Sequence, residues 1–121
     1  MPSVQNGTGG VLAQGTVAAS AGYLYGPVAG GNQQVELRGV VFSNESASAT
    51  TVTYGVGKSG ATVGAAGSSA GKTQPVGAAG SSTATLDASE LELMILGPGD
   101  YIWALAGTGS VVGYTINGIV Y

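Results

Sequence analysis

The chain has very few side chains of the kind that carry chemistry. Its 121 residues include six acidic and three basic residues, and there is no histidine and no cysteine. Histidine is the side chain whose ordinary pKa lies closest to neutral pH, and cysteine supplies disulfides and thiolate nucleophiles. The composition therefore predicts a protein that is not an enzyme and that uses no cofactor.

The charge balance also excludes several kinds of partner. The sequence pI is about 4.4, and the basic residues are Arg38, Lys58 and Lys72. Nucleic-acid binding requires clustered Lys and Arg residues that neutralise phosphates. No apolar run approaches the roughly 18 residues of a membrane-spanning helix, and the first residues lack the basic and apolar regions of a secretory signal. We therefore expect no nucleic-acid partner and no membrane.

The scarcity of charge has a second consequence, for association. Charged residues make up 7% of the chain, against roughly 25% in typical soluble domains. Few charges leave little electrostatic repulsion between copies. This favours a protein whose surface is covered by other protein in an assembly. The alternative is a free monomer that Ser, Thr, Gly and Asn side chains keep soluble.

Residues 1–15 differ from the rest of the chain. Residues 1–10 are rich in glycine and polar side chains and show no periodicity. Such a segment is disordered in a free monomer unless a neighbour holds it. We predict an extended N-terminal arm over residues 1–15, which reaches a neighbouring subunit, and one domain over residues 16–121.

The domain has the pattern of short strands. Residues 22–25 form a short aromatic strand that Pro27 ends, as at a sheet edge. Strands over 35–43 and 50–56 flank a polar turn at 44–48 and predict a hairpin. The alternation changes phase at Gly39, which indicates either a bulge or a strand buried on both faces.

The C-terminal third gives the strongest strand signal. Residues 97–100 read Gly-Pro-Gly-Asp, the chemistry of a type II turn, and lead into a strand over 101–106. Another alternating segment begins at Val112, and Asn117-Gly118 is either a bulge or a hairpin turn. Short strands with frequent turns predict a single all-β domain: an antiparallel β-sandwich or a jelly-roll-like β-barrel.

Two segments allow two interpretations. Residues 57–82 are mostly Gly, Ala, Ser and Thr, and the heptad at 63–69 recurs at 76–82. They form either a long, weakly structured loop or an exposed hairpin that packs on a neighbour. Residues 88–95 alternate as a strand does, which we prefer, although Ser89 and the acids also suit the first turn of a short helix.

Apparent catalytic motifs fail on spacing or context. Glu90 and Glu92 would share a face of a strand, but a solvated face explains them, and with Asp87 they form at most a loose cluster. Residues 67–73 have one residue too few between the glycines for a phosphate-binding loop. The sequence predicts no catalytic, cofactor-binding or metal site.

Aromatic and apolar side chains remain as candidates for contact with other molecules. At strand spacing an aromatic residue usually fills a core or a subunit contact, although exposed rings also bind sugars. The aromatic candidates are Tyr23, Tyr25, Tyr54, Tyr101, Trp103, Tyr114 and Tyr121. The residues that we predict at an interface are Val4, Val11, Leu12, Tyr23, Tyr25, Trp103 and Tyr121.

Two parts of the sequence resemble small structural proteins of tailed bacteriophages. Residues 40–53 (VVFSNESASATTVT) resemble their apolar strand, Asn-x-Ser turn and Thr/Val strand. Residues 96–102 (LGPGDYI) and 115–121 (TINGIVY) resemble their C-terminal ending, although Asn117 stands where Ser is common and Val120 where an acid often occurs.

The resemblance implies a β-sandwich in a virus particle. The expected function is that of a capsid decoration (cement) protein, which bridges subunits of the major capsid protein on the outside of the head. It would be made in the host cytoplasm and would associate with copies of itself, as a trimer. The alternative is a tail- or fibre-associated module that recognises the host by binding surface carbohydrate. The resemblance carries no catalytic residues.

Overall fold

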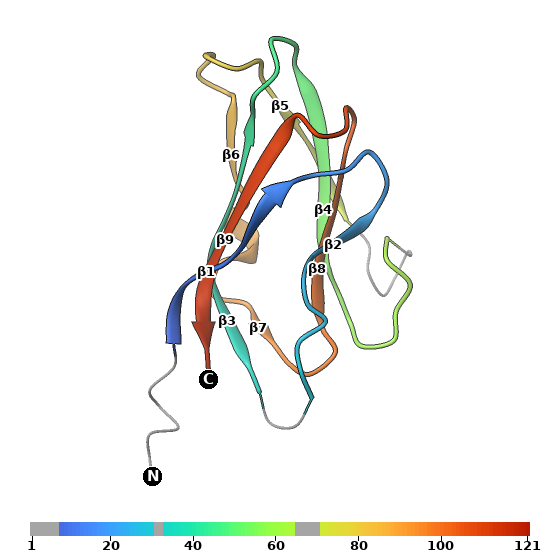
Figure 1. The fold of residues 1–121 in the computed structure, drawn as a ribbon, viewed down its shortest axis with the longest axis vertical. Coiled ribbons are helices and arrows are strands. Elements are labelled where there is room, and N and C mark those ends of the chain that lie inside the picture. Colours follow the sequence, from blue (N-terminus) through green and yellow to red (C-terminus); the bar gives the residue numbers. More distant parts are fainter. Residues whose placement is uncertain (1–7, 31–32, 65–70) are drawn as a thin grey trace.

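The fold is a β-sandwich. The computed structural model describes residues 8–30, 33–64 and 71–121, and these form two antiparallel sheets packed face to face (Figure 1). Neither sheet closes on itself, so of the two expected architectures the sandwich is confirmed and the barrel is not. No helix in the described part of the chain is long and apolar enough to cross a membrane.

The two sheets share the strands almost equally. In the first sheet the order is β1-β9-β3-β6, and β7 also pairs with β3; in the second the order is β2-β8-β4-β5. The 3₁₀ helix η2 (Ser89–Leu91) connects β6 to β7. The strands of the first sheet are β1 (Thr8–Thr16), β9 (Val112–Val120), β3 (Val35–Asn44), β6 (Thr85–Asp87) and β7 (Ile95–Leu96). Those of the second are β2 (Gly22–Tyr25), β8 (Tyr101–Ala106), β4 (Thr50–Gly57) and β5 (Lys72–Val76).

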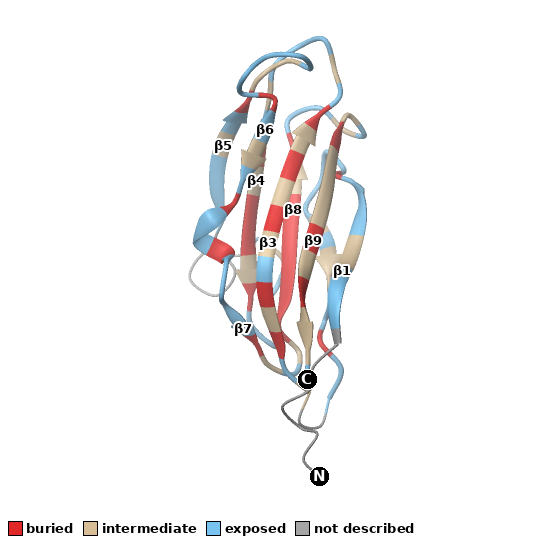
Figure 2. Ribbon diagram, turned by 90° about the vertical axis from the view of Figure 1, so that its left-hand side faces the viewer, coloured by how far each residue is buried: buried red, intermediate tan, exposed pale blue. Residues whose placement is uncertain are grey.

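The hydrophobic core lies between the sheets and follows the alternation of the strands. Figure 2 shows buried residues concentrated in β3, β9, β8 and β4, whereas β1 and β5 are mostly exposed or half-buried. Phe42 of β3 stacks obliquely on Tyr54 of β4, with ring centroids 5.3 Å apart. The rest of the core is largely aliphatic and includes Val35, Leu37, Val40, Val52, Ile102, Val112 and Ile116.

The bulge expected near Gly39 is confirmed. The register of β3 against β9 shifts between Leu37 and Gly39, so Arg38 is the extra residue and points to solvent. The extra residue allows Leu37 and Val40, three positions apart, both to face the core. A second register shift lies across β9, between Val11 and Ala13 of β1.

Asn117 and Gly118 do not form a turn. They lie within β9, opposite both bulges. A Cβ atom on Gly118 would lie 2.6 Å from the Glu36 carbonyl oxygen and 2.8 Å from Leu12 Cδ1. Glycine therefore allows the neighbouring strands to approach here.

The hairpin predicted from 35–43 and 50–56 is wrong, although both strands exist. β3 belongs to the first sheet and β4 to the second, so the connection crosses the sandwich. The buried side chain of Asn44 directs this crossing. Its Nδ2 donates to the carbonyl oxygens of Ser48 (2.9 Å) and Gly77 (3.0 Å), and its Oδ1 accepts from the backbone N–H of Ser46 (2.9 Å). A local asparagine turn thus replaces hairpin pairing.

The arm predicted over residues 1–15 is in large part a strand of the sandwich. Residues 8–15 belong to β1, which pairs with β9 from Thr8–Val120 to Thr16–Gly113, so the expected boundary at residue 16 falls inside a strand. Sequence alternation is weak here because β1 is glycine-rich and lies at an edge. Residues 1–7 lie outside the described residues.

The glycine-rich segment 57–82 contributes strand β5, and some of its described residues before β5 pack on β8. Residues 72–76 form β5, which pairs with β4 and not with another described part of the segment. Earlier residues of the segment lie over the outer face of β8: Tyr101 Oη donates to the Ala61 carbonyl oxygen (2.9 Å). A Cβ atom on Gly71 would lie 2.6 Å from the ring of Trp103. Both faces of β8 are therefore buried.

The turn before β8 holds the residues that follow β4, through contacts of Asp100 with Lys58 and Ser59. Gly99 has φ +86°, as the middle of a type II turn requires, and the Asp100 N–H donates to the Gly97 carbonyl oxygen (3.1 Å). The Asp100 carboxylate accepts from the N–H groups of Gly97 (3.0 Å) and Ser59 (3.2 Å), with Lys58 Nζ at 3.7 Å. The expected turn is confirmed, and its acid also holds the segment that follows β4.

The strand preferred over residues 88–95 is wrong for most of its length. Ser89–Leu91 form η2, and strand structure begins at Ile95. Leu93 has φ +66°, and its N–H donates to the Leu37 carbonyl oxygen (2.7 Å). The short-helix alternative was closer, because burial of Leu91 against the core outweighs the alternation of the sequence.

We expect Asn44→Ala to destabilise the fold strongly. The substitution leaves two carbonyl oxygens and one N–H without their side-chain partner, and we expect the free energy of unfolding to fall by about 2–3 kcal/mol. Chemical denaturation would measure it. The control is Ser43→Ala, which removes an exposed hydroxyl and should cost no more than about 0.5 kcal/mol. Equal effects of the two substitutions would contradict a special role for Asn44.

A second prediction concerns the close approach of β4 to Tyr101. A Cβ atom on Gly57 would overlap the Tyr101 ring, which is buried and hydrogen-bonded to Ala61 and so cannot move freely. We expect Gly57→Ala to destabilise the protein by about 2–3 kcal/mol in thermal or chemical denaturation. A Cβ atom on Gly22 would meet no atom within 4 Å, so Gly22→Ala should change stability by less than about 0.5 kcal/mol.

Candidate functional site

Four of the seven predicted interface residues lie on β1 and β2. These two strands end their respective sheets, and they contact each other on one side of the sandwich (Figure 1). Val11 of β1 and Tyr23 of β2 are 57% and 53% exposed. Leu12 and Tyr25 are half-buried and pack against the core, and burial raises the pKa of Tyr25. The four residues therefore lie on one side of the molecule, where Val11 and Tyr23 are available for contact, and the interface itself stays a prediction.

The other three predicted residues have different outcomes. Trp103 is 2% exposed, with Gly64 and Gly71 close to its ring, so its side chain is not available for contact in the described structure. Tyr121 is 45% exposed, and its hydroxyl donates to Glu36 Oε1 (3.1 Å), at the outer face of the first sheet. Val4 lies outside the described residues.

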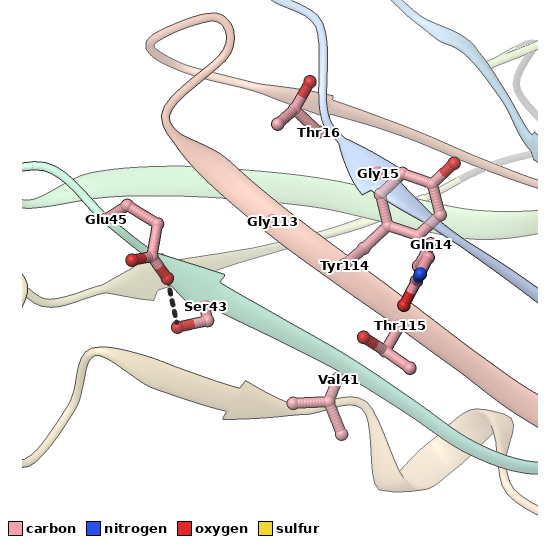
Figure 3. A pocket seen from close by; sticks show the side chains of 9 residues that line it. All are labelled: Gln14, Gly15, Thr16, Val41, Ser43, Glu45, Gly113, Tyr114 and Thr115. Carbon is pink, nitrogen blue, oxygen red and sulfur yellow. Dashed lines mark hydrogen bonds between the residues drawn. The ribbon is translucent and has the colours of Figure 1, made fainter. Parts of the chain in front are cut away.

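A shallow hollow of about 570 Å³ adjoins β1 on the outer face of the first sheet (Figure 3). Gly113 forms part of its floor, because a glycine between Thr16 and Ser43 leaves that row of the sheet without a central side chain. The lining mixes apolar and polar side chains and carries a single acid, Glu45, which accepts a hydrogen bond from Ser43 Oγ (3.1 Å). The hollow is lined by Gln14, Gly15, Thr16, Val41, Ser43, Glu45, Gly113, Tyr114 and Thr115. Sequence analysis did not find it, since its residues come from three strands distant in the chain.

A second group of polar residues connects the two sheets. Tyr54 Oη, on β4, donates to Glu90 Oε2 (2.9 Å), and Lys72 Nζ, on β5, lies 3.1 Å from the same oxygen. Glu90 belongs to η2, which packs on β3 of the first sheet. The three side chains therefore close the side of the sandwich opposite β1.

These contacts change the pKa values of Tyr54 and Glu90. Burial, together with the hydrogen bond to Glu90 and the negative charge of that residue, raises the pKa of Tyr54 to about 12. Burial opposes ionisation of Glu90, but hydrogen bonds from its own backbone and from Tyr54 and the ammonium group of Lys72 outweigh it and lower the Glu90 pKa. A carboxylate held ionised in this way is a structural partner, because it has lost basicity.

The described residues give no support to the motifs that the sequence analysis rejected. They contain no group of three acidic, histidine or cysteine side chains placed to hold a metal ion. Glu90 lies in η2 and bonds to Tyr54 and Lys72, so it does not form a strand pair with Glu92. Lys72 and Thr73 begin β5 rather than a helix, and helix formation after the loop is what a phosphate-binding motif requires.

The aromatic side chains do not form one exposed platform in the described structure. Tyr54 and Tyr101 are buried with Trp103, and Tyr23 packs edge-on against Tyr101, with ring centroids 4.8 Å apart. Tyr23 and Tyr121 are the strongly exposed rings, and they lie on different sheets. Sugar binding usually requires a ring face that is free to stack, so this arrangement does not favour it.

Comparison with known proteins adds no relative. No protein-family model, no curated protein and no solved structure matches the chain. The resemblance to bacteriophage structural proteins therefore stays a prediction from the sequence.

The Tyr54–Glu90 contact predicts a loss of stability at alkaline pH. Between about pH 10 and 12 the unfolded chain loses the Tyr54 proton while the folded chain retains it, so the free energy of unfolding falls as pH rises. We expect this contribution to reach roughly 1–3 kcal/mol. Chemical denaturation at several pH values should show a shallower alkaline decline for Tyr54→Phe than for the wild type. Glu90→Gln should also reduce the decline, and an unchanged slope in both variants would contradict the assignment.

Proposed function

We propose that this chain is a structural protein of a bacteriophage particle, most specifically a capsid decoration protein that binds the major capsid protein on the outside of the head. The observation that carries the proposal is the nature of the surface: nearly uncharged, β-rich and without a converging set of catalytic groups in the described residues. The resemblance at residues 40–53, 96–102 and 115–121 supplies the kind of particle.

The mechanism that we propose is mechanical. A decoration protein stabilises a shell when contacts across neighbouring subunits bury surface that would otherwise meet water. Apolar burial contributes about 25 cal/mol per Å², and the entropy lost on association offsets part of it. Val11 and Tyr23 supply exposed apolar surface on the β1–β2 side, and few charges must be removed from water there. Repetition over the shell multiplies a modest contact.

The proposal predicts that the protein binds to heads in a fixed number of copies per shell. Heads assembled without this protein should take up the purified chain to a fixed number of copies per shell, and the decorated heads should release DNA at a higher temperature. Quantitative gel densitometry and a dye-accessibility melt measure the two results. Occupancy that never saturates, or saturation without added heat resistance, would overturn the decoration function.

The same assay tests the arm predicted from the sequence. A chain that lacks residues 1–7 keeps the whole of β1, so we expect it to fold and to bind heads with lower occupancy. A matched variant, Tyr23→Ser, tests the contribution of β2, because this side chain is 53% exposed. Uptake of the isolated protein on a glycan array, in contrast, would favour the carbohydrate-binding alternative.

A further inference from the structure

The edges of the two sheets differ in their capacity to accept another strand. An exposed edge presents unpaired N–H and C=O groups, and proteins usually protect it with proline, charge, a bulge or short length. β1 ends the first sheet, and β9 is its sole strand partner in the described structure. It is nine residues long and contains no proline and no charged residue. Its one protection is the bulge between Val11 and Ala13.

The other described edges are better protected. β5 carries Lys72 and Pro75, and a proline removes a donor from the edge. β2 has four residues and a register shift between Tyr23 and Tyr25. β6 and β7 have three and two residues, and η2 separates them. β1 is therefore the edge best suited to pairing.

We propose that β1 pairs with β1 of a second copy of this chain, antiparallel and about a two-fold axis. An open edge of one copy cannot pair well with a protected edge of the next, so the suitable partner is the same strand. Such a contact uses the same surface on both copies and closes at two, whereas a contact between different edges gives a ring where its rotation closes and a fibre where it does not. The absence of charge on β1 removes like-charge repulsion across the axis.

The bulge limits the pairing to residues 13–16. Residues directly opposite in an antiparallel pair point to the same face, so a two-fold axis at Gln14 places this residue opposite Gln14 of the second copy. Its side chain is exposed and lies beside Thr115 at the hollow (Figure 3). An amide carries both donor and acceptor groups, so two facing glutamines can bond to each other. The trimer expected from the sequence would require a further contact.

Charge reversal at Gln14 tests the pairing. Sedimentation velocity of the wild type over a range of concentrations should show the mass rising from 11.7 kDa towards twice that value. Gln14→Glu and Gln14→Lys each place two like charges opposite one another and should weaken association about tenfold. An equimolar mixture of the two variants should regain association at least equal to that of the wild type, because the facing charges are then opposite.

The controls lie on the opposite edge of the same sheet. Thr85 of β6 is exposed as Gln14 is, so Thr85→Glu and Thr85→Lys should associate as the wild type does. The chain has no cysteine, so Gln14→Cys should form a disulfide-linked dimer under mild oxidation much faster than Thr85→Cys. A wild type that stays monomeric up to millimolar concentration would overturn the proposal. Single Gln14 charge variants that associate normally, or a mixture no stronger than they are, would also overturn it.

The outcome is independent of the capsid proposal, because self-association is measured without heads. A protein that pairs through β1 and fails to bind heads would retain this inference and lose the proposed function. A protein that binds heads as a monomer would do the reverse.

Discussion

The second sheet depends on the burial of Tyr101 and Trp103 on the outer face of β8. A strand of a two-layer sandwich normally has one face in the core and one in water. Here Ile102, Ala104 and Ala106 face the core, while the rings of Tyr101 and Trp103 lie against described residues between β4 and β5, among them Ala61 and Gly71. Gly57 and Gly71 leave space for the rings, and Asp100 and Tyr101 hold the covering residues by hydrogen bonds. Glycine content, which reads as weak structure in the sequence, is thus what permits close packing.

Features that depend on neighbouring residues could be predicted from the sequence, whereas features that depend on long-range contacts could not. Strand alternation predicted the class of fold and indicated the bulge at Gly39, and the Gly-Pro-Gly-Asp sequence predicted the turn at 97–100, because each of these features depends on neighbouring residues. Which strands pair with each other could not be predicted. Asn44 donates a hydrogen bond to the carbonyl of Gly77, 33 positions away, and this contact favours the placement of β4 in the other sheet. The burial of Trp103 could not be predicted, because no periodicity shows that glycine-rich residues lie against its ring. Val11 and Tyr23 lie on edge strands and are exposed, so their place at an interface stays a prediction that the structure permits.

The few charges of this protein mostly bond to each other. Each basic residue has an acidic neighbour: Arg38 with Glu36 (3.3 Å), Lys58 with Asp100 (3.7 Å) and Lys72 with Glu90 (3.1 Å). Exposed pairs of this kind contribute little to stability. Two of them nevertheless connect separate parts of the fold. Lys58 and Asp100 join the end of β4 to the turn before β8, and Lys72 and Glu90 join the second sheet to η2. β1 itself contains no charged residue, so association there requires no charge to leave water.

The pairing of β1 with β9 also determines how the domain responds to force. The two strands are antiparallel neighbours, and Thr8 lies opposite Val120, so the chain enters and leaves the domain at the same corner (Figure 1). A load applied between the ends would open the ladder one hydrogen bond at a time, as a zipper opens, and would meet low resistance. A load across the sandwich would act on many bonds together. A domain of this design bears tension well through its flanks and poorly through its ends.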